Sequence, residues 1–233
     1  MEDTLRRRVL VVSSSPRPDG NSRALGEALL EGAQEAGHEG DLADLNDVMR
    51  GGFLRDCRRC RRADGSCSIE DDFEAFLRDR VAPADAIVYA TPLYWYGTAA
   101  VLKNYFDRMV CFISGSYPHH EAMTAGLTGK RSALLLSSEE RFPGAALGVI
   151  AQLQEVSRYL HHEFVGVVNG IGNKRGEVAL DPLDPLDAAR DLGRRMFDLY
   201  YSDFDIASVR PNAVWARAAS NAHDVAVGVY EDV

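Results

Sequence analysis

Short apolar runs alternate along the chain with amphipathic segments. Runs of four to eight apolar residues bounded by turn residues are typical of strands buried on both faces, and they occur at Val9–Ser13, Gly40–Leu45, Ala86–Ala90, Ala133–Ser137 and Phe164–Val168. Apolar residues at three-to-four spacing predict helices over Ala24–Ala36, Asp72–Arg80, Ala99–Phe112, Ala145–His161 and Pro185–Tyr201. This alternation predicts an α/β three-layer sandwich, a five-stranded parallel sheet with helices on both faces. The usual strand order is 2-1-3-4-5, with a ligand crevice outside strands 1 and 3.

One domain and an extension account for the length of the chain. We assign residues 1–202 to the α/β domain, because no linker or repeat interrupts the alternation. Residues 203–233 form a C-terminal extension whose apolar residues include Val209, Trp215 and Tyr230. Such residues are seldom left in water, so we expect the extension to contact a second subunit; folding back on its own domain is the alternative.

The first predicted strand runs directly into a polar, glycine-containing segment. Its hydroxyl, amide and guanidinium groups precede a helix whose first turn offers free N–H groups and the positive end of its dipole. The candidate residues for binding a phosphate are Ser13, Ser14, Ser15, Arg17, Gly20, Asn21 and Ser22. The alternative is a polar connection that binds nothing.

Two further loops reach the same predicted crevice. The third strand is followed by three aromatic residues between a proline and a glycine, and aromatic faces suit a flat, conjugated ligand. The candidate residues are Pro92, Leu93, Tyr94, Trp95, Tyr96 and Gly97. After the fourth strand, Ser138 and Glu139 could approach the same ligand or form a solvated turn.

Charge and cysteine content narrow the classes of partner. A formal net charge of -9 and a pI of about 5.2 argue against nucleic acid or an anionic membrane as the main partner. The sequence shows neither a signal peptide nor a membrane span. Its four cysteines, three of them between Cys57 and Cys67, do not resemble a secreted disulfide framework. We therefore expect a reducing, cytoplasmic setting.

Three stretches resemble one known family. SSPRPDGNS, DDFEAFLRDRVAPADAIVYATPLYWYG and LKNYFDR are similar to the NADPH-dependent FMN reductase family of flavodoxin-like proteins, near its iron–sulfur flavoprotein and multimeric quinone reductase branches. The resemblance spans about Arg8–Gly170. It implies FMN as cofactor, NAD(P)H as electron donor, and a homodimer or homotetramer. It also implies that the phosphate lies at Ser13–Ser22 and the isoalloxazine at Pro92–Gly97.

The cysteines depart from the iron–sulfur branch. That branch has C-x2-C-x2-C and a fourth cysteine, whereas this chain has Cys57, Cys60, Ala63 and Cys67. A cubane cluster usually needs four thiolates, so we predict no metal; a zinc site is a minor alternative. The neighbouring arginines favour thiolates, which makes a redox-sensitive thiol pair or a remnant without metal the preferred interpretation.

The resemblance and the crevice together predict an FMN-dependent oxidoreductase. In the expected ping-pong reaction a nicotinamide reduces FMN and leaves, and a quinone, a flavin or another small conjugated acceptor then takes the electrons. Two alternatives remain. One is a flavodoxin-type electron carrier, marked by an exposed flavin edge ringed by acidic residues. The other is a flavin-binding redox sensor that uses the Cys57–Cys67 loop.

Overall fold

Five parallel strands form one sheet in the order β2-β1-β3-β4-β5. The strands are β1 Arg8–Ser13, β2 Glu39–Asp44, β3 Ala86–Pro92, β4 Arg131–Ser138 and β5 Glu163–Ile171. The computed structural model describes residues 6–56 and 60–200. The predicted flavodoxin-like sheet and its strand order are confirmed, and each strand begins and ends within three residues of the run that predicted it.

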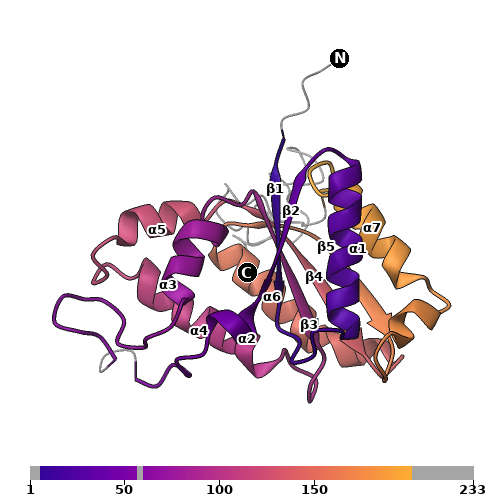
Figure 1. Ribbon diagram of the computed structural model, residues 1–233, viewed down its shortest axis with the longest axis horizontal. Helices are drawn as coiled ribbons and strands as arrows, with labels where there is room; N and C mark the ends of the chain where they lie inside the picture. Colours follow the sequence, from indigo (N-terminus) through magenta and orange to yellow (C-terminus); the bar gives the residue numbers. More distant parts are fainter. Residues whose placement is uncertain (1–5, 57–59, 201–233) are drawn as a thin grey trace, which may run out of the picture.

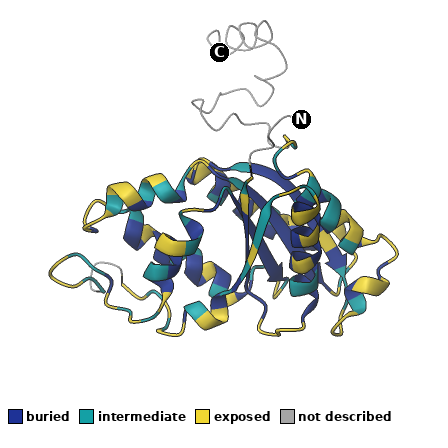
Figure 2. Cartoon of the chain, turned by 45° about the horizontal axis from the view of Figure 1, so that its top comes forward, coloured by how far each residue is buried: buried dark blue, intermediate teal, exposed yellow. Residues whose placement is uncertain are grey.

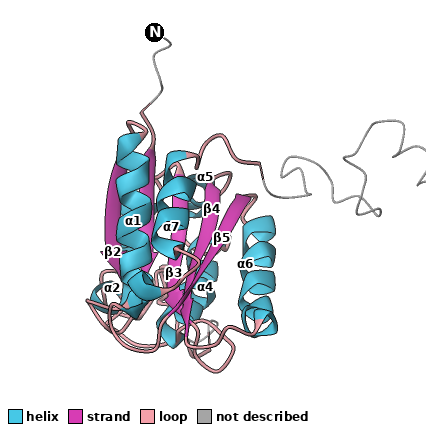
Figure 3. Ribbon diagram, turned by 90° about the vertical axis from the view of Figure 1, so that its right-hand side faces the viewer, coloured by secondary structure: helices cyan, strands magenta, loops and turns pink. Residues whose placement is uncertain are grey.

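Helices cover both faces of the sheet (Figures 1 and 3). Helices α1 Asn21–Glu35 and α7 Pro185–Arg194 lie together on one face. The other face carries α3 Phe73–Phe76, α4 Ala100–Ile113, α5 His120–Leu127 and α6 Leu147–Tyr159. The short α2 Leu45–Val48, the π-helical turn Leu77–Val81 and the 3-10 turns Pro143–Ala146 and Glu177–Leu180 complete the helices of the described residues.

Alternation along the strands divides the apolar residues into two cores. In β1, Val9 and Val11 pack with α1 and α7, whereas Leu10 and Val12 pack with α4 and α6 on the opposite face. Figure 2 shows the strands buried between the two helical layers. Because both faces are covered, the polar groups that follow β1, β3 and β4 collect at the carboxyl ends of the strands.

Several predicted bounds are corrected by the structure. The last helix ends at Arg194 rather than Tyr201, and the Arg131 guanidinium donates to the carbonyls of Met196 and Leu199 beyond it. The predicted helix Asp72–Arg80 is a short α-helix continued by a π-helical turn. The proposed extension 203–233 lies outside the described residues. No helix in the described ranges is long and apolar enough to cross a membrane.

A buried ion pair joins the long connection after β2 to α4. The Arg108 guanidinium donates two hydrogen bonds to the Asp71 carboxylate, at 2.5 and 2.7 Å, and both side chains are at most 2% exposed. Asp71 also accepts the N–H groups of Gly51 and Phe73, and the Arg108 guanidinium lies 4.6 Å from the Phe73 ring centre. Buried charges are tolerated only with partners of this kind.

Removing one partner of this pair should cost far more stability than removing a surface charge on the same helix. Asp71→Asn leaves the Arg108 charge buried and unpaired, and we expect the free energy of unfolding to fall by about 3–5 kcal/mol. The control is Lys103→Ala, which breaks an exposed pair with Asp107 on α4 and should cost under about 1 kcal/mol. Urea unfolding of the variants measures the difference; equal losses would contradict it.

Candidate functional site

One cleft lies at the carboxyl edge of the sheet, among the loops that follow β1, β3, β4 and β5. Its volume is about 690 Å³, within the usual range for ligand sites of roughly 300–1,000 Å³. The lining residues are Ser15, Arg17, Gly20, Asn21, Ser22, Pro92, Leu93, Tyr94, Trp95, Tyr96, Ser137, Ser138, Glu139, Glu140, Gly172 and Asn173. The three loops expected from the sequence therefore meet at one site.

The loop after β1 presents donors at the start of α1. The Ser15 hydroxyl donates to the Arg17 carbonyl at 3.0 Å and accepts the Arg17 N–H at 3.1 Å, which fixes a tight turn. A Cβ at Gly20 would lie 2.6 Å from the Ser15 hydroxyl, so a larger residue there would displace this hydroxyl from its turn. The N–H groups of Asn21 and Ser22 belong to the first helical turn, which has no intrahelical acceptors. The exposed Arg17 guanidinium makes no ion pair with the described residues, so this end of the cleft suits an anion.

Asn21 lines the cleft, but its side chain holds the neighbouring loop. Its amide nitrogen donates to the carbonyls of Gly172 and Lys174, both at 2.9 Å. Its amide oxygen accepts the N–H of Val178 at 3.4 Å. The amide donors of Asn21, which were predicted to bind a phosphate, are thus bound to carbonyls, and Asn21 joins the loop after β5 to the start of α1.

The aromatic loop after β3 turns through an unusual backbone conformation. Tyr94 and Gly97 exchange both N–H···O bonds at 3.0 Å, and the two residues between them, Trp95 and Tyr96, have φ of 49° and 61°. A two-residue hairpin turn with positive φ at both positions is normally made by Asn-Gly. A residue with a bulky side chain at positive φ costs about 1–2 kcal/mol of backbone strain. The turn leaves the Trp95 side chain almost fully accessible, at 96% exposure.

Hydrogen bonds from the sheet hold this turn in place. The buried Thr91 hydroxyl accepts the N–H of Ala99 at 3.1 Å, and the Leu93 N–H donates to the Ser137 carbonyl at 2.8 Å. The Tyr96 hydroxyl donates to the Glu140 carboxylate at 3.1 Å, which raises the pKa of that phenol. Strained, exposed aromatic residues held by such contacts are typical of ligand sites.

Three predicted site residues lie outside the cleft lining. Ser13 and Ser14 are buried, and the Ser14 hydroxyl and N–H both donate to the Ala90 carbonyl of β3. The Gly97 N–H is taken by the Tyr94 carbonyl. Conversely, the cleft lining includes Ser137, Gly172 and Asn173, which were not predicted, and Glu140, which directly follows the predicted Ser138 and Glu139. Their position along the chain could have identified them, because each lies at or just beyond the end of β4 or β5, where ligands bind in this type of sheet.

Comparison with known proteins identifies the family. The model of the family described as NADPH-dependent FMN reductase matches residues 7–171. The chain belongs to this family. Membership in the NADPH-dependent FMN reductases makes the chain an oxidoreductase that uses FMN and NAD(P)H.

Relatives in this family cover most of the chain. An iron–sulfur flavoprotein of Methanocaldococcus jannaschii is 25% identical over 82% of this chain and 96% of its own length. A Bacillus subtilis protein with the provisional name of NAD(P)H-dependent FMN-containing oxidoreductase is 23% identical, over 81% of this chain and 97% of its own. The solved NAD(P)H:quinone oxidoreductase from Methanothermobacter marburgensis shares the fold, with a TM-score of 0.59, 20% identity, and coverage of 84% and 98%.

The strained turn predicts a conflict between stability and ligand binding in this FMN reductase. Replacing both residues, Trp95→Asn with Tyr96→Gly, should raise the free energy of unfolding by about 1–3 kcal/mol, because both new residues tolerate positive φ. The same change should weaken FMN binding, because the aromatic faces are lost.

The control is Trp95→Ala, which removes a ring but keeps a side chain at positive φ. It should weaken binding without raising stability. Urea unfolding of the protein without FMN, and titration with FMN, give the two quantities. A double variant that is no more stable than the parent would show that the turn is not strained.

Proposed function

We propose that this FMN oxidoreductase passes electrons from NAD(P)H to a small conjugated acceptor, a quinone or a flavin, within the cleft at the carboxyl ends of the strands. The observation that carries the proposal is the composition of that cleft. It combines the start of a helix and a cation with exposed aromatic faces in one cleft. A ligand that has both a phosphate and a flat ring fits this distribution of groups.

The residues present fit FMN at this site. The first-turn N–H groups of α1 and the Arg17 guanidinium would hold the phosphate. The segment Pro92–Tyr96 would contact the isoalloxazine, and Ser138 and Glu139 line the same cleft. When bound, FMN supplies hydride acceptance and electron transfer. Asn21 positions the loop after β5, as its two bonds to carbonyls require.

The exposed side of the cleft supports alternating use by two substrates. Trp95 and Tyr96 are 96% and 56% exposed, so one planar substrate at a time can stack at the open edge of the site. A nicotinamide and a conjugated acceptor are both planar, and one aromatic surface serves each in turn. This supports a ping-pong order rather than a complex that contains both.

The proposal includes a cytoplasmic homodimer or homotetramer. Support for assembly comes from an apolar groove of about 430 Å³ between α4 and α6, where Val110 and Tyr159 are 47% and 61% exposed. Support for a reducing compartment comes from the cysteine content, which does not resemble a secreted disulfide framework.

Arg17 should contribute strongly to FMN affinity. Arg17→Ala removes a charge-assisted contact with the phosphate, worth about 1.5–3 kcal/mol, so the Kd for FMN should rise about tenfold or more. Flavin fluorescence titration at fixed salt measures it.

The matched control is Arg23→Ala, which removes an arginine two residues into α1. Arg23 pairs with Glu27 on the helix surface at 2.9 Å, so its loss should change the Kd less than twofold. Equal effects of the two variants would place the phosphate elsewhere.

Steady-state kinetics distinguish the oxidoreductase from an electron carrier. With NADPH and a benzoquinone varied together, initial rates should give parallel double-reciprocal lines, because the two substrates share one surface. Intersecting lines would mean that both bind at once. If neither NADH nor NADPH reduces the bound flavin in a stopped-flow mixing experiment, the carrier interpretation replaces this one.

A further inference from the structure

The cysteine-containing connection folds into a small hairpin, residues 60–68. The Ser68 N–H donates to the Cys60 carbonyl at 2.8 Å, and the Arg62 N–H donates to the Ser66 carbonyl at 3.0 Å. Arg61 and Cys67 face each other as an antiparallel bridge. Cys67 therefore has a fixed position on the returning arm of the hairpin.

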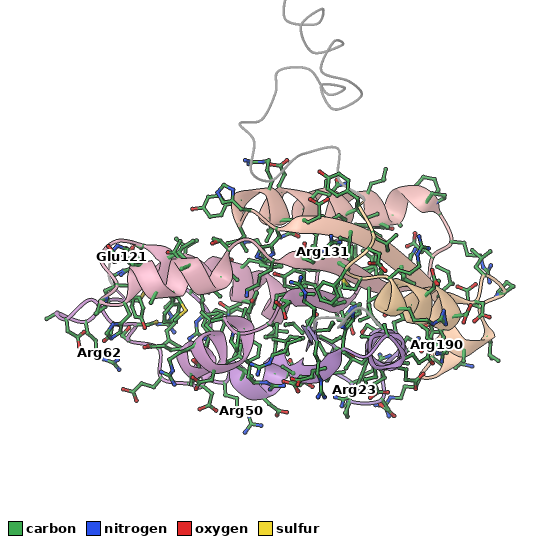
Figure 4. All side chains as sticks on the ribbon, turned by 90° about the horizontal axis from the view of Figure 1, so that it is seen from above. Arg23, Arg50, Arg62, Glu121, Arg131 and Arg190 are labelled. Carbon is green, nitrogen blue, oxygen red and sulfur yellow. The ribbon has the colours of Figure 1, made fainter. Side chains whose placement is uncertain are left out.

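Two contacts hold this hairpin against the carboxyl end of α4 and the residues just after it, and a third holds the part of the connection that follows the hairpin. The Arg61 guanidinium donates to the Cys111 carbonyl at 2.9 Å. At the tip, Gly65 has φ of +85°, and a Cβ there would lie 2.1 Å from the Ser116 carbonyl oxygen, so the backbones are in close contact. Beyond the hairpin, the buried pair of Asp71 and Arg108 ties the same connection to α4. Figure 4 shows Arg62 of the hairpin at the opposite end of the molecule from Arg190.

This docking brings together two cysteines that are far apart in sequence. Cys67 and Cys111 are 7% and 3% exposed and belong to the same apolar cluster, and the Cys111 side chain lies close enough to Cys67 to lower its pKa. A cavity of about 270 Å³ reaches Cys67, so a small oxidant has a route to its sulfur. The charged residues that line this cavity are Arg62, Glu70, Asp71, Glu74 and Arg108.

We propose that Cys67 and Cys111 are a site of reversible oxidation, at which hydrogen peroxide converts the two thiols into a disulfide that staples the hairpin to α4. Neither thiol belongs to the flavin cleft described above, so the proposal is independent of the oxidoreductase activity. It assigns the attack to Cys67, which lines the cavity, and the resolving role to Cys111, which lies deeper.

The surroundings of Cys67 favour its thiolate. The neighbouring Cys111 thiol lowers the pKa of Cys67 to about 6, against the opposing effect of burial. The Ile69 backbone and the Arg108 charge also lower this pKa, and the Asp71 charge raises it. The thiolate of Cys67 is therefore more populated at neutral pH than that of an ordinary cysteine. A thiolate is the nucleophile in oxidation by peroxide.

The proposed step balances in atoms and electrons. The Cys67 thiolate attacks one peroxide oxygen and becomes a sulfenic acid, and the departing hydroxide takes a proton to form water. The Cys111 thiol then attacks the Cys67 sulfur, forming the S–S bond and releasing the sulfenic oxygen as a second water. The two thiols lose two electrons in total, which reduce one peroxide to two waters. A dithiol reductant reverses the change.

Peptide mapping of the full-length protein tests the pairing directly. Trypsin cleaves the chain so that Cys57, Cys60, Cys67 and Cys111 fall in four different peptides. After one equivalent of hydrogen peroxide, alkylation and digestion without reductant, mass spectrometry should find peptide 63–78 joined to peptide 109–130. Dithiothreitol should separate them. The variant Cys60→Ser should keep the cross-link, whereas Cys111→Ala should lose it.

Other products overturn the proposal. These are Cys67 joined to Cys57 or Cys60, Cys67 oxidised to a sulfinic acid without a partner, or no change at Cys67. Stoichiometric iron in the purified protein would also overturn it, because Cys67 would then be a cluster ligand. The peptide map of the unaltered protein shows whether the Cys67–Cys111 cross-link forms, even if Cys111→Ala fails to fold. If that variant folds, the pH midpoint for alkylating Cys67 should rise by about one unit or more, toward its ordinary pKa of 9.0.

Discussion

The divergence of the chain after β1 and β3 is the constraint on which the site depends. These strands are neighbours in the sheet, yet β1 is followed by a helix on one face and β3 by a helix on the other. The two connecting loops must therefore separate, and a crevice opens between them. Because the strands are apolar on both sides, polar groups gather only where the strands end. The position of the cleft follows from topology before any particular side chain is considered.

Within that crevice, hydrogen bonds decide which groups remain available to a ligand. The side chains of Ser14 and Asn21 donate hydrogen bonds to backbone carbonyls, so they hold the loops in place and are not available to a ligand. The Arg17 guanidinium and the ring of Trp95 are exposed, and no contact with the described residues occupies them. Strain at Trp95 persists because Thr91 and Ser137 hold both arms of its loop. Rigid supports and unsatisfied contact groups are what a preorganised site requires.

The sequence was sufficient for features that periodicity or topology determines. Alternating apolar runs located all five strands, and the polar residues after three of them located the cleft. Features that depend on distant contacts were not accessible in this way. Nothing local shows that the Asn21 amide meets the loop after β5, or that Gly97 is paired within its own turn. Cys111 is far from the other cysteines in the sequence. It lies near Cys67 because the folded hairpin packs against the end of α4, and this contact cannot be read from the sequence.

Helix α4 relates the cleft to the thiols and also keeps them apart. It begins directly after the aromatic loop, and Cys111 lies eleven residues after Ala100, or roughly 17 Å along the axis. A residue of the cleft and Cys111 therefore cannot contact one small ligand. Between them, Arg108 pairs with Asp71 and so anchors the cysteine-containing connection to the helix. The Arg108 charge also favours the Cys67 thiolate, but its partner Asp71 opposes this effect, and the larger effect comes from the Cys111 thiol. The anchoring of the connection on α4 thus places Cys67 near Cys111, and the thiol pair that we propose does not require an iron–sulfur cluster.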